Sequence, residues 1–129
     1  MKSFQAIFDK SAIGLSILCI AHCLLVPVLI TLLPVVAAIG LGDESFHRLL
    51  IVGILPISVV ALFLGCRRHR TWSVLLLGTL GLIILVVTAI LGHEILGDFL
   101  EKFATVIGSV FIMLSHFRNF RLCRQHQYC

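Results

Sequence analysis

The sequence contains few charged residues. Asp, Glu, Lys and Arg make up 12% of the 129 residues, whereas 60% are hydrophobic and the mean hydropathy is +1.14. Soluble domains carry about a quarter charged residues. The composition therefore excludes an ordinary soluble domain and indicates an integral membrane protein. A chain of this length accommodates one domain, which we place at residues 1–129.

Signatures of several common functions are also missing. The chain has no Gly-x4-Gly-Lys-Ser/Thr sequence, which argues against a P-loop ATPase. Its basic residues flank apolar runs instead of forming a stripe, so we expect no nucleic-acid partner despite the net charge of +4. The five cysteines are odd in number and scattered, unlike a disulfide framework. The first apolar run exceeds the roughly 7–15 residues of a signal-peptide core, so we expect it to be retained.

Four long apolar segments are present. We expect membrane-spanning helices at 11–41, 48–65, 72–91 and 98–117, followed by a polar tail at 118–129. The first exceeds the ~20 residues that cross a bilayer, and its Pro27 and Pro34 each predict a kink. The expected fold class is all-α, an integral membrane four-helix bundle.

The distribution of basic residues predicts the orientation. Eight of the ten Lys and Arg residues lie in the first ten residues, the loop at 66–70 and the tail, and only Arg48 and Lys102 lie in the other two loops. Basic residues are retained on the cytoplasmic side. We therefore expect both termini in the cytoplasm of a multi-pass protein of a bacterial-type inner (plasma) membrane.

The first apolar run contains a potential metal site. Cys19, His22 and Cys23 are three and four residues apart, so on a helix they share one face, with Ser16 one turn earlier. A histidine in hydrocarbon usually marks a functional site. Thiolate sulfur and imidazole nitrogen suit zinc, copper(I) and mercury(II). The alternative is that the cysteines are small core residues and His22 bonds to a neighbouring helix.

Two further groups of possible ligands lie at the helix ends. One is an outer acidic rim, for which the alternative is a solvated helix end; its candidate ligands are His47, His93 and Glu94, with Asp43, Glu44, Asp98 and Glu101 nearby. The other is cytoplasmic, where cysteines stay reduced. Its candidates are Cys66, His69, Cys123, His126 and Cys129, and the alternative is a tail that contains Cys and His by chance.

Three stretches of the chain form a specific pattern. They are Asp9-x4-Gly14-x-Ser16-x2-Cys19-x2-His22-Cys23-Leu24-x2-Pro27, the basic loop at 67–70, and Ser115-His116-Phe-Arg-Asn119-Phe-Arg-Leu-Cys123. Together they resemble the MerC family of four-span inner-membrane proteins associated with mercury resistance and mercuric-ion uptake. The resemblance extends over nearly the whole chain. It implies transport toward the cytoplasm and an ion-binding role for Cys19 and Cys23.

We therefore expect a carrier for a divalent soft or borderline metal ion, zinc or mercuric ion, that needs no cofactor and is not an enzyme. His22 beside two thiols favours zinc. Alternatives are a thiol oxidoreductase, a haem protein ligated by His22 and His116, and a metal sensor without transport. Gly78 and Gly81 form a small-residue patch but lack Gly-x3-Gly spacing, which leaves a homo-oligomer open.

Overall fold

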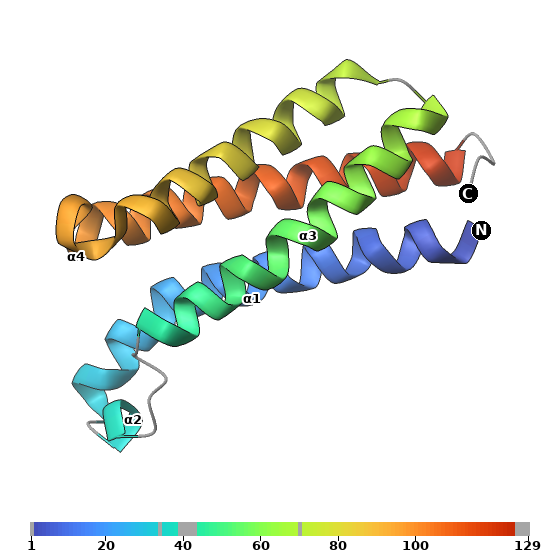
Figure 1. Cartoon of the computed structure of the whole chain (residues 1–129). Coiled ribbons are helices and arrows are strands. Elements are labelled where there is room, and N and C mark those ends of the chain that lie inside the picture. The colour runs from blue at the N-terminus through green and yellow to red at the C-terminus, as the bar shows by residue number, and fades with distance from the viewer. Residues whose placement is uncertain (1, 34, 39–43, 70, 126–129) are drawn as a thin grey trace.

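The computed structural model describes residues 2–33, 35–38, 44–69 and 71–125, nearly all of them helical. The elements are α1 (Lys2–Leu32), α2 (Val35–Ala38), α3 (Glu44–His69) and α4 (Trp72–Gln125) (Figure 1). The all-α class expected from the sequence is confirmed. The described part of the chain contains no strand.

The long helix α4 reverses direction and forms a helical hairpin (Figure 1). Gly92 and Gly97 have positive φ angles of 60° and 73°. Side chains with a Cβ rarely adopt this conformation, so glycine is the residue suited to the reversal. We call residues 72–91 the first arm and residues 98–125 the second arm. With α1 and α3, the two arms give the four long helical segments that the hydropathy pattern predicted.

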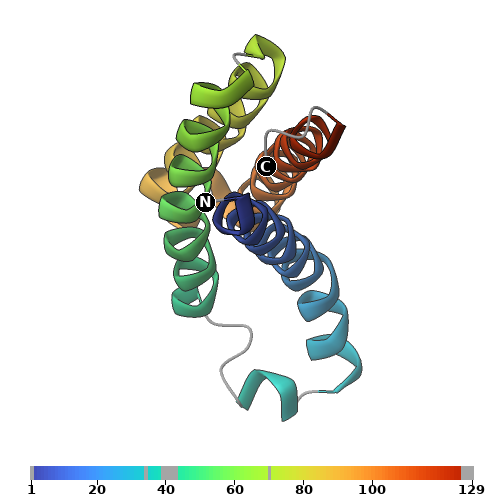
Figure 2. The same cartoon turned by 90° about the vertical axis from the view of Figure 1, so that its right-hand side faces the viewer.

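The four segments are arranged in a bundle with two distinct ends. The start of α1, the end of α3 and the end of α4 share one end, which we call the terminal end (Figure 1). The reversal of α4 and the start of α3 lie at the opposite end, the reversal end. Seen from the terminal end, α1 begins between α3 and the second arm (Figure 2), and it packs against both α3 and α4. The expected topology requires this placement, whereas the side of the membrane that each end faces stays a prediction.

Glycines allow the two arms of α4 to approach closely. A Cβ atom on Gly81 would lie 2.8 Å from the carbonyl oxygen of Gly108, and one on Gly78 would lie 2.8 Å from Ser115 Oγ. Ser115 Oγ also donates a hydrogen bond of 2.8 Å to the carbonyl of Val74, which joins the arms near the terminal end. Gly78 and Gly81 therefore serve packing within the chain, so the small-residue patch is not evidence for a homo-oligomer.

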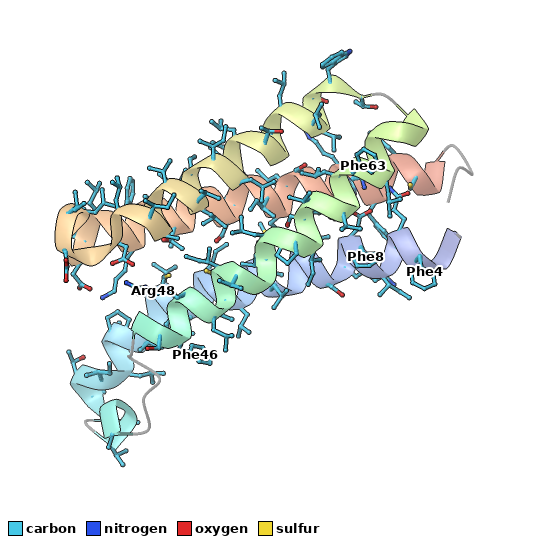
Figure 3. The ribbon with its side chains drawn as sticks, in the orientation of Figure 1. Phe4, Phe8, Phe46, Arg48 and Phe63 are labelled. Atoms are coloured by element: carbon cyan, nitrogen blue, oxygen red, sulfur yellow. The ribbon has the colours of Figure 1, made fainter. Side chains whose placement is uncertain are left out.

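The outer surface of the bundle is apolar (Figure 3). Leu24, Leu25 and Ile90 are among many exposed large hydrophobic side chains. Two helical segments, Phe4–Leu32 and Trp72–Gly92, are long and apolar enough to cross a membrane, and Arg48–Leu64 is a shorter apolar helix. The structure thus has the apolar surface that suits a lipid bilayer.

The bounds of the first helix differ from the expected span at 11–41. The helix begins at Lys2, because the residues before Ser11 belong to it without interruption. It ends at Leu32. Pro27 lies inside the helix, where its ring removes one backbone hydrogen bond. Pro34, the second expected kink, lies outside the described residues.

Candidate metal site

The buried face of α1 consists of small and polar side chains. Its members recur at alternating intervals of four and three residues, so they form one stripe along the helix; they are Gln5, Asp9, Ala12, Ser16, Cys19 and Cys23. Many of the large hydrophobic side chains of the same helix are exposed, among them Phe4, Ile17 and Leu24. This distribution suits a helix with lipid outside and a polar interface inside.

The second arm of α4 presents a matching stripe to α1. Its buried members also recur at intervals of three or four residues and are Glu101, Thr105, Ser109, Ile112, His116, Asn119 and Cys123. The two helices run antiparallel, with Asp9 beside His116 and Asn119 and with Cys19 near Ser109. We call the buried polar residues of these two stripes the polar seam. It extends from Gln5 and Cys123 at the terminal end to Cys23 and Glu101 toward the reversal end.

Cys19 and Cys23 form a pair of free thiols in this seam. Cys19 is fully buried and Cys23 is 4% exposed. The two thiols lie within hydrogen-bonding reach of each other, and the Ser109 hydroxyl is close to Cys19. Apolar residues of α3 and both arms of α4 enclose the pair; they are Leu50, Ile51, Ile54, Leu85 and Ile112. Buried apolar surroundings exclude water, so the pair is accessible chiefly along the seam.

A charged pair of groups lies close to the thiols. Glu101 and Lys102 are near enough to Cys23 to act on it electrostatically. Glu101 is 8% exposed, whereas Lys102 reaches outward to Asp98, with Nζ 2.7 Å from Oδ2. The sequence suggested Glu101 only as one acid of the rim. The structure places both Glu101 and Lys102 within electrostatic range of Cys23, and the ammonium group of Lys102 acts on this thiol more strongly than the carboxylate does.

His22 does not complete a three-ligand site. Its ring packs against Phe46, near the start of α3 (Figure 3), with ring centroids 5.0 Å apart. The side chain is half-buried on the α3 side of α1, whereas the thiols belong to the seam with α4. Among the described residues, no three His, Cys, Asp or Glu side chains are grouped so that they could hold a metal ion. The structure therefore brings together the two thiols but not the expected trio.

A second polar cluster lies near the terminal end. His116 Nδ1 is 2.8 Å from Asp9 Oδ1, and Asn119 Nδ2 donates to Asp9 Oδ1 and Oδ2 at 3.0 and 2.8 Å. All three side chains are fully buried. His116 Nε2 is also buried and has no hydrogen-bond partner in the part of the chain that the structure describes. All three residues stand in the segments that resemble MerC, but nothing in their spacing indicated that they lie together.

The two histidines proposed as haem ligands are held far apart. His22 packs on Phe46, and His116 packs on Asp9. Asp9 and His22 are 13 residues apart on α1, which corresponds to ~20 Å along the helix axis. One haem iron cannot bind both rings in this arrangement. The haem interpretation therefore has no support in the structure.

The expected outer rim is described only in part. Glu94 is exposed in the short segment between Gly92 and Gly97, and the side chains of His47 and His93 lie outside the description. His47 belongs to the first turn of α3, so its backbone lies at the reversal end, as the backbone of His93 does (Figure 1). Their roles as ligands stay predictions.

The expected cytoplasmic ligands are also described only in part. Cys123 is buried on the second arm and is disulfide-bonded, which differs from the reduced cysteine that the sequence analysis expected at this end, so it could bind a metal only after reduction. Cys66 and His69 belong to the last turn of α3, but their side chains lie outside the description. His126 and Cys129 lie outside the described residues altogether. The proposal of tail ligands stays a prediction.

A protein-family model matches most of this chain. The model described as MerC mercury resistance protein matches residues 9–121, which is most of the chain and includes Asp9, the thiol pair, His116 and Asn119. No curated protein sequence and no solved structure matches this chain.

Proposed function

Because the chain belongs to the MerC mercury resistance family, whose role is the handling of metal ions in a membrane, we propose that it carries a soft divalent metal ion across the bilayer. In this proposal the ion binds between Cys19 and Cys23 and moves along the polar seam. The observation that supports it best is the buried pair of free thiols at the interface of α1 and α4.

Mercuric ion fits this pair better than zinc does. Soft metal ions prefer thiolate sulfur, and two thiolates suffice for an ion that accepts linear two-fold coordination. Protein zinc sites are almost always four-coordinate, or have three protein ligands and water. The preference for zinc in the sequence analysis depended on His22 as a third ligand. Because His22 packs on Phe46 instead, we propose mercuric ion as the preferred cargo.

The polar seam supports a route for the ion. Glu101 acts electrostatically on Cys23, with Lys102 opposing it, and its carboxylate would attract a cation toward the thiols from the reversal end. Beyond Cys19 the seam continues through Ser16 to Asp9 and His116 at the terminal end. The Lys and Arg distribution supports a cytoplasmic position for the terminal end, so the direction we propose is inward. Cytosolic thiols, which are kept reduced, would remove the ion and draw it through.

Transport can be measured in proteoliposomes loaded with a fluorescent mercury chelator. We expect mercuric ion to enter faster than zinc, and we expect a Cys19→Ser/Cys23→Ser variant to reduce mercury entry to the rate of protein-free vesicles. The matched control is Ala21→Ser, which adds a hydroxyl to the same turn and leaves both thiols in place. It should transport like the unchanged protein.

Two results would contradict the proposal. If the double variant transported mercuric ion normally, the route would not pass through the thiol pair. If the unchanged protein bound mercuric ion at these thiols but moved none across the bilayer, a sensor would replace the carrier. Binding can be followed separately by equilibrium dialysis, so the two outcomes are distinguishable.

A further inference from the structure

In the cluster of Asp9, His116 and Asn119, the buried Nε2 atom of His116 has no hydrogen-bond partner among the described residues. The Asp9 carboxylate lies within hydrogen-bond distance of His116 Nδ1 through Oδ1, and both of its oxygens accept hydrogen bonds from Asn119 Nδ2. An ionised carboxylate only accepts hydrogen bonds, so the hydrogen of the neutral imidazole belongs on Nδ1. The other nitrogen, Nε2, then carries a lone pair. It has no partner among the described residues, although His116 is fully buried.

Buried nitrogen atoms without a partner are uncommon in folded proteins, so an unpaired one requires an explanation. Other unpaired groups lie at nearby levels of the bundle. Ser16 Oγ and Ser58 Oγ are buried and have no hydrogen-bond partner among the described residues. Ser16 is on the same stripe of α1 as Asp9. The antiparallel register set by the His22–Phe46 contact places Ser58 of α3 at about the level of Asp9 to Ala12.

The arrangement around His116 is one that proteins use for metal ligands. A metal-binding histidine typically donates its other ring N–H to a carboxylate, which fixes the tautomer and raises the basicity of the ligating nitrogen. Asp9 stands in that position relative to His116, and Asn119 holds the carboxylate. The carboxylate also supplies a negative charge close to where a cation would bind.

We propose that His116 Nε2 is a second ligand for the transported metal ion, with Asp9 and Asn119 as its positioning residues. This inference rests on the proposed carrier function and adds a station to its route. Cys19 is ten residues from Asp9 on α1, about 15 Å along the axis, so the imidazole forms a separate site. A single imidazole binds mercuric ion more weakly than two thiolates do, which suits release at the terminal end.

The proposal can be tested by ¹⁵N NMR of histidine-labelled protein in micelles. The protein carries Cys19→Ser and Cys23→Ser, and HgCl₂ or ZnCl₂ is added beyond the amount that the remaining thiols take up. We expect the His116 Nε2 resonance to shift saturably while Nδ1 stays protonated. The resonance is assigned by its loss in His116→Gln, and His22→Gln is the matched control that must leave it unchanged.

Asp9→Asn tests the positioning role while nearly conserving side-chain volume. We expect it to raise the metal concentration that gives the half-maximal Nε2 shift about 10- to 100-fold, the usual effect of losing such a carboxylate. Asp98→Asn makes the same substitution at an exposed carboxylate near the reversal end and should have no effect. Circular dichroism of both variants checks that the helices are retained.

The outcomes separate the possibilities. If the Nε2 resonance responds to neither metal ion, the proposal is overturned. It is also overturned if the resonance changes only when acid is added, because the cluster then binds a proton instead of a metal ion. This readout uses binding in a protein without the thiol pair, so it does not depend on transport. Loss of transport in the Cys19→Ser/Cys23→Ser variant with no metal response at His116 would leave the carrier in place and remove only the second station.

Discussion

His116 Nδ1 lies 2.8 Å from Asp9 Oδ1, although 107 residues separate the two in the sequence. The contact joins the second turn of α1 to the second arm of α4 inside the bundle, and both side chains are fully buried. Asn119 adds two hydrogen bonds to the same carboxylate. Asp9 is therefore the acceptor on which the polar contacts of this interface converge.

Removing the Asp9 carboxylate should destabilise the protein. Asp9→Ala leaves the buried polar groups of His116 and Asn119 without their acceptor, and breaking such a buried pair costs about 3–5 kcal/mol. Asp9→Asn retains an acceptor oxygen and should cost less. The free energy of unfolding is measured by denaturant titration in mixed micelles. Asp98→Ala removes an exposed ion pair and should change the free energy of unfolding by less than about 1 kcal/mol. Equal losses of stability in Asp9→Ala and Asp98→Ala would contradict the role of Asp9 as a buried acceptor.

His22→Gln should distinguish two-thiol from three-ligand binding. If only Cys19 and Cys23 hold the ion, this variant keeps most of its mercury affinity, whereas Cys23→Ser loses more than the roughly 10- to 100-fold that the loss of an outer-shell partner of a metal ligand costs. Competition with a small dithiol chelator measures both affinities. A large loss in His22→Gln would restore the three-ligand site that favours zinc.

Gly81→Ala should loosen the hairpin of α4. The added Cβ would lie 2.8 Å from the Gly108 carbonyl oxygen and 2.8 Å from Ile112 Cγ1, so one arm must shift. Overpacking of this kind costs roughly 1–3 kcal/mol. Gly14→Ala is the matched control, since its Cβ would meet nothing within 4 Å and helical alanine is favoured over glycine by about 1 kcal/mol. Thermal unfolding midpoints should therefore shift in opposite directions.

Glu101→Gln should slow metal entry. The Glu101 carboxylate acts on the region of Cys23, and an attraction of about 1 kcal/mol, the value for two unit charges 4 Å apart in bulk water, corresponds to roughly a fivefold change in rate. Glu94→Gln alters an exposed acid at the reversal end and should have a smaller effect that disappears at high salt. Initial uptake rates in proteoliposomes at low and high salt test both variants. Identical rates for Glu101→Gln and the unchanged protein would remove Glu101 from the route.

The hydropathy pattern predicted the helical segments of the fold, whereas the helix ends and the reversal of α4 were not predicted. The apolar runs predicted the long helical segments, because a bilayer span needs an uninterrupted apolar helix. The end of α1 at Leu32 was not predicted: the apolar run continues to Leu41, and Pro34 was interpreted as a kink within one long helix, whereas the helix ends two residues before this proline. The reversal of α4 depends on Gly92 and Gly97, whose positive φ angles could not be foreseen from their identity alone.

The site was predictable to the extent that it is local. Spacing along one helix placed Cys19 and Cys23 together, and the structure retains that pair in the core. His22 shares the same turn, but its partner Phe46 belongs to α3, and spacing within α1 contains no information about that contact. The same reason explains why His116 was proposed as a haem ligand when its neighbour is Asp9.

The sequence by itself determined the membrane character, the helical class and the pairing of Cys19 with Cys23, because these follow from hydrophobicity and from the 3.6-residue repeat of one helix. Only the tertiary structure decided that His22 packs against Phe46 instead of completing a group with the two thiols, and that His116 contacts Asp9 beside Asn119. Those outcomes depend on the rotation and register of α1 against α3 and the second arm, which side-chain packing across the helices sets.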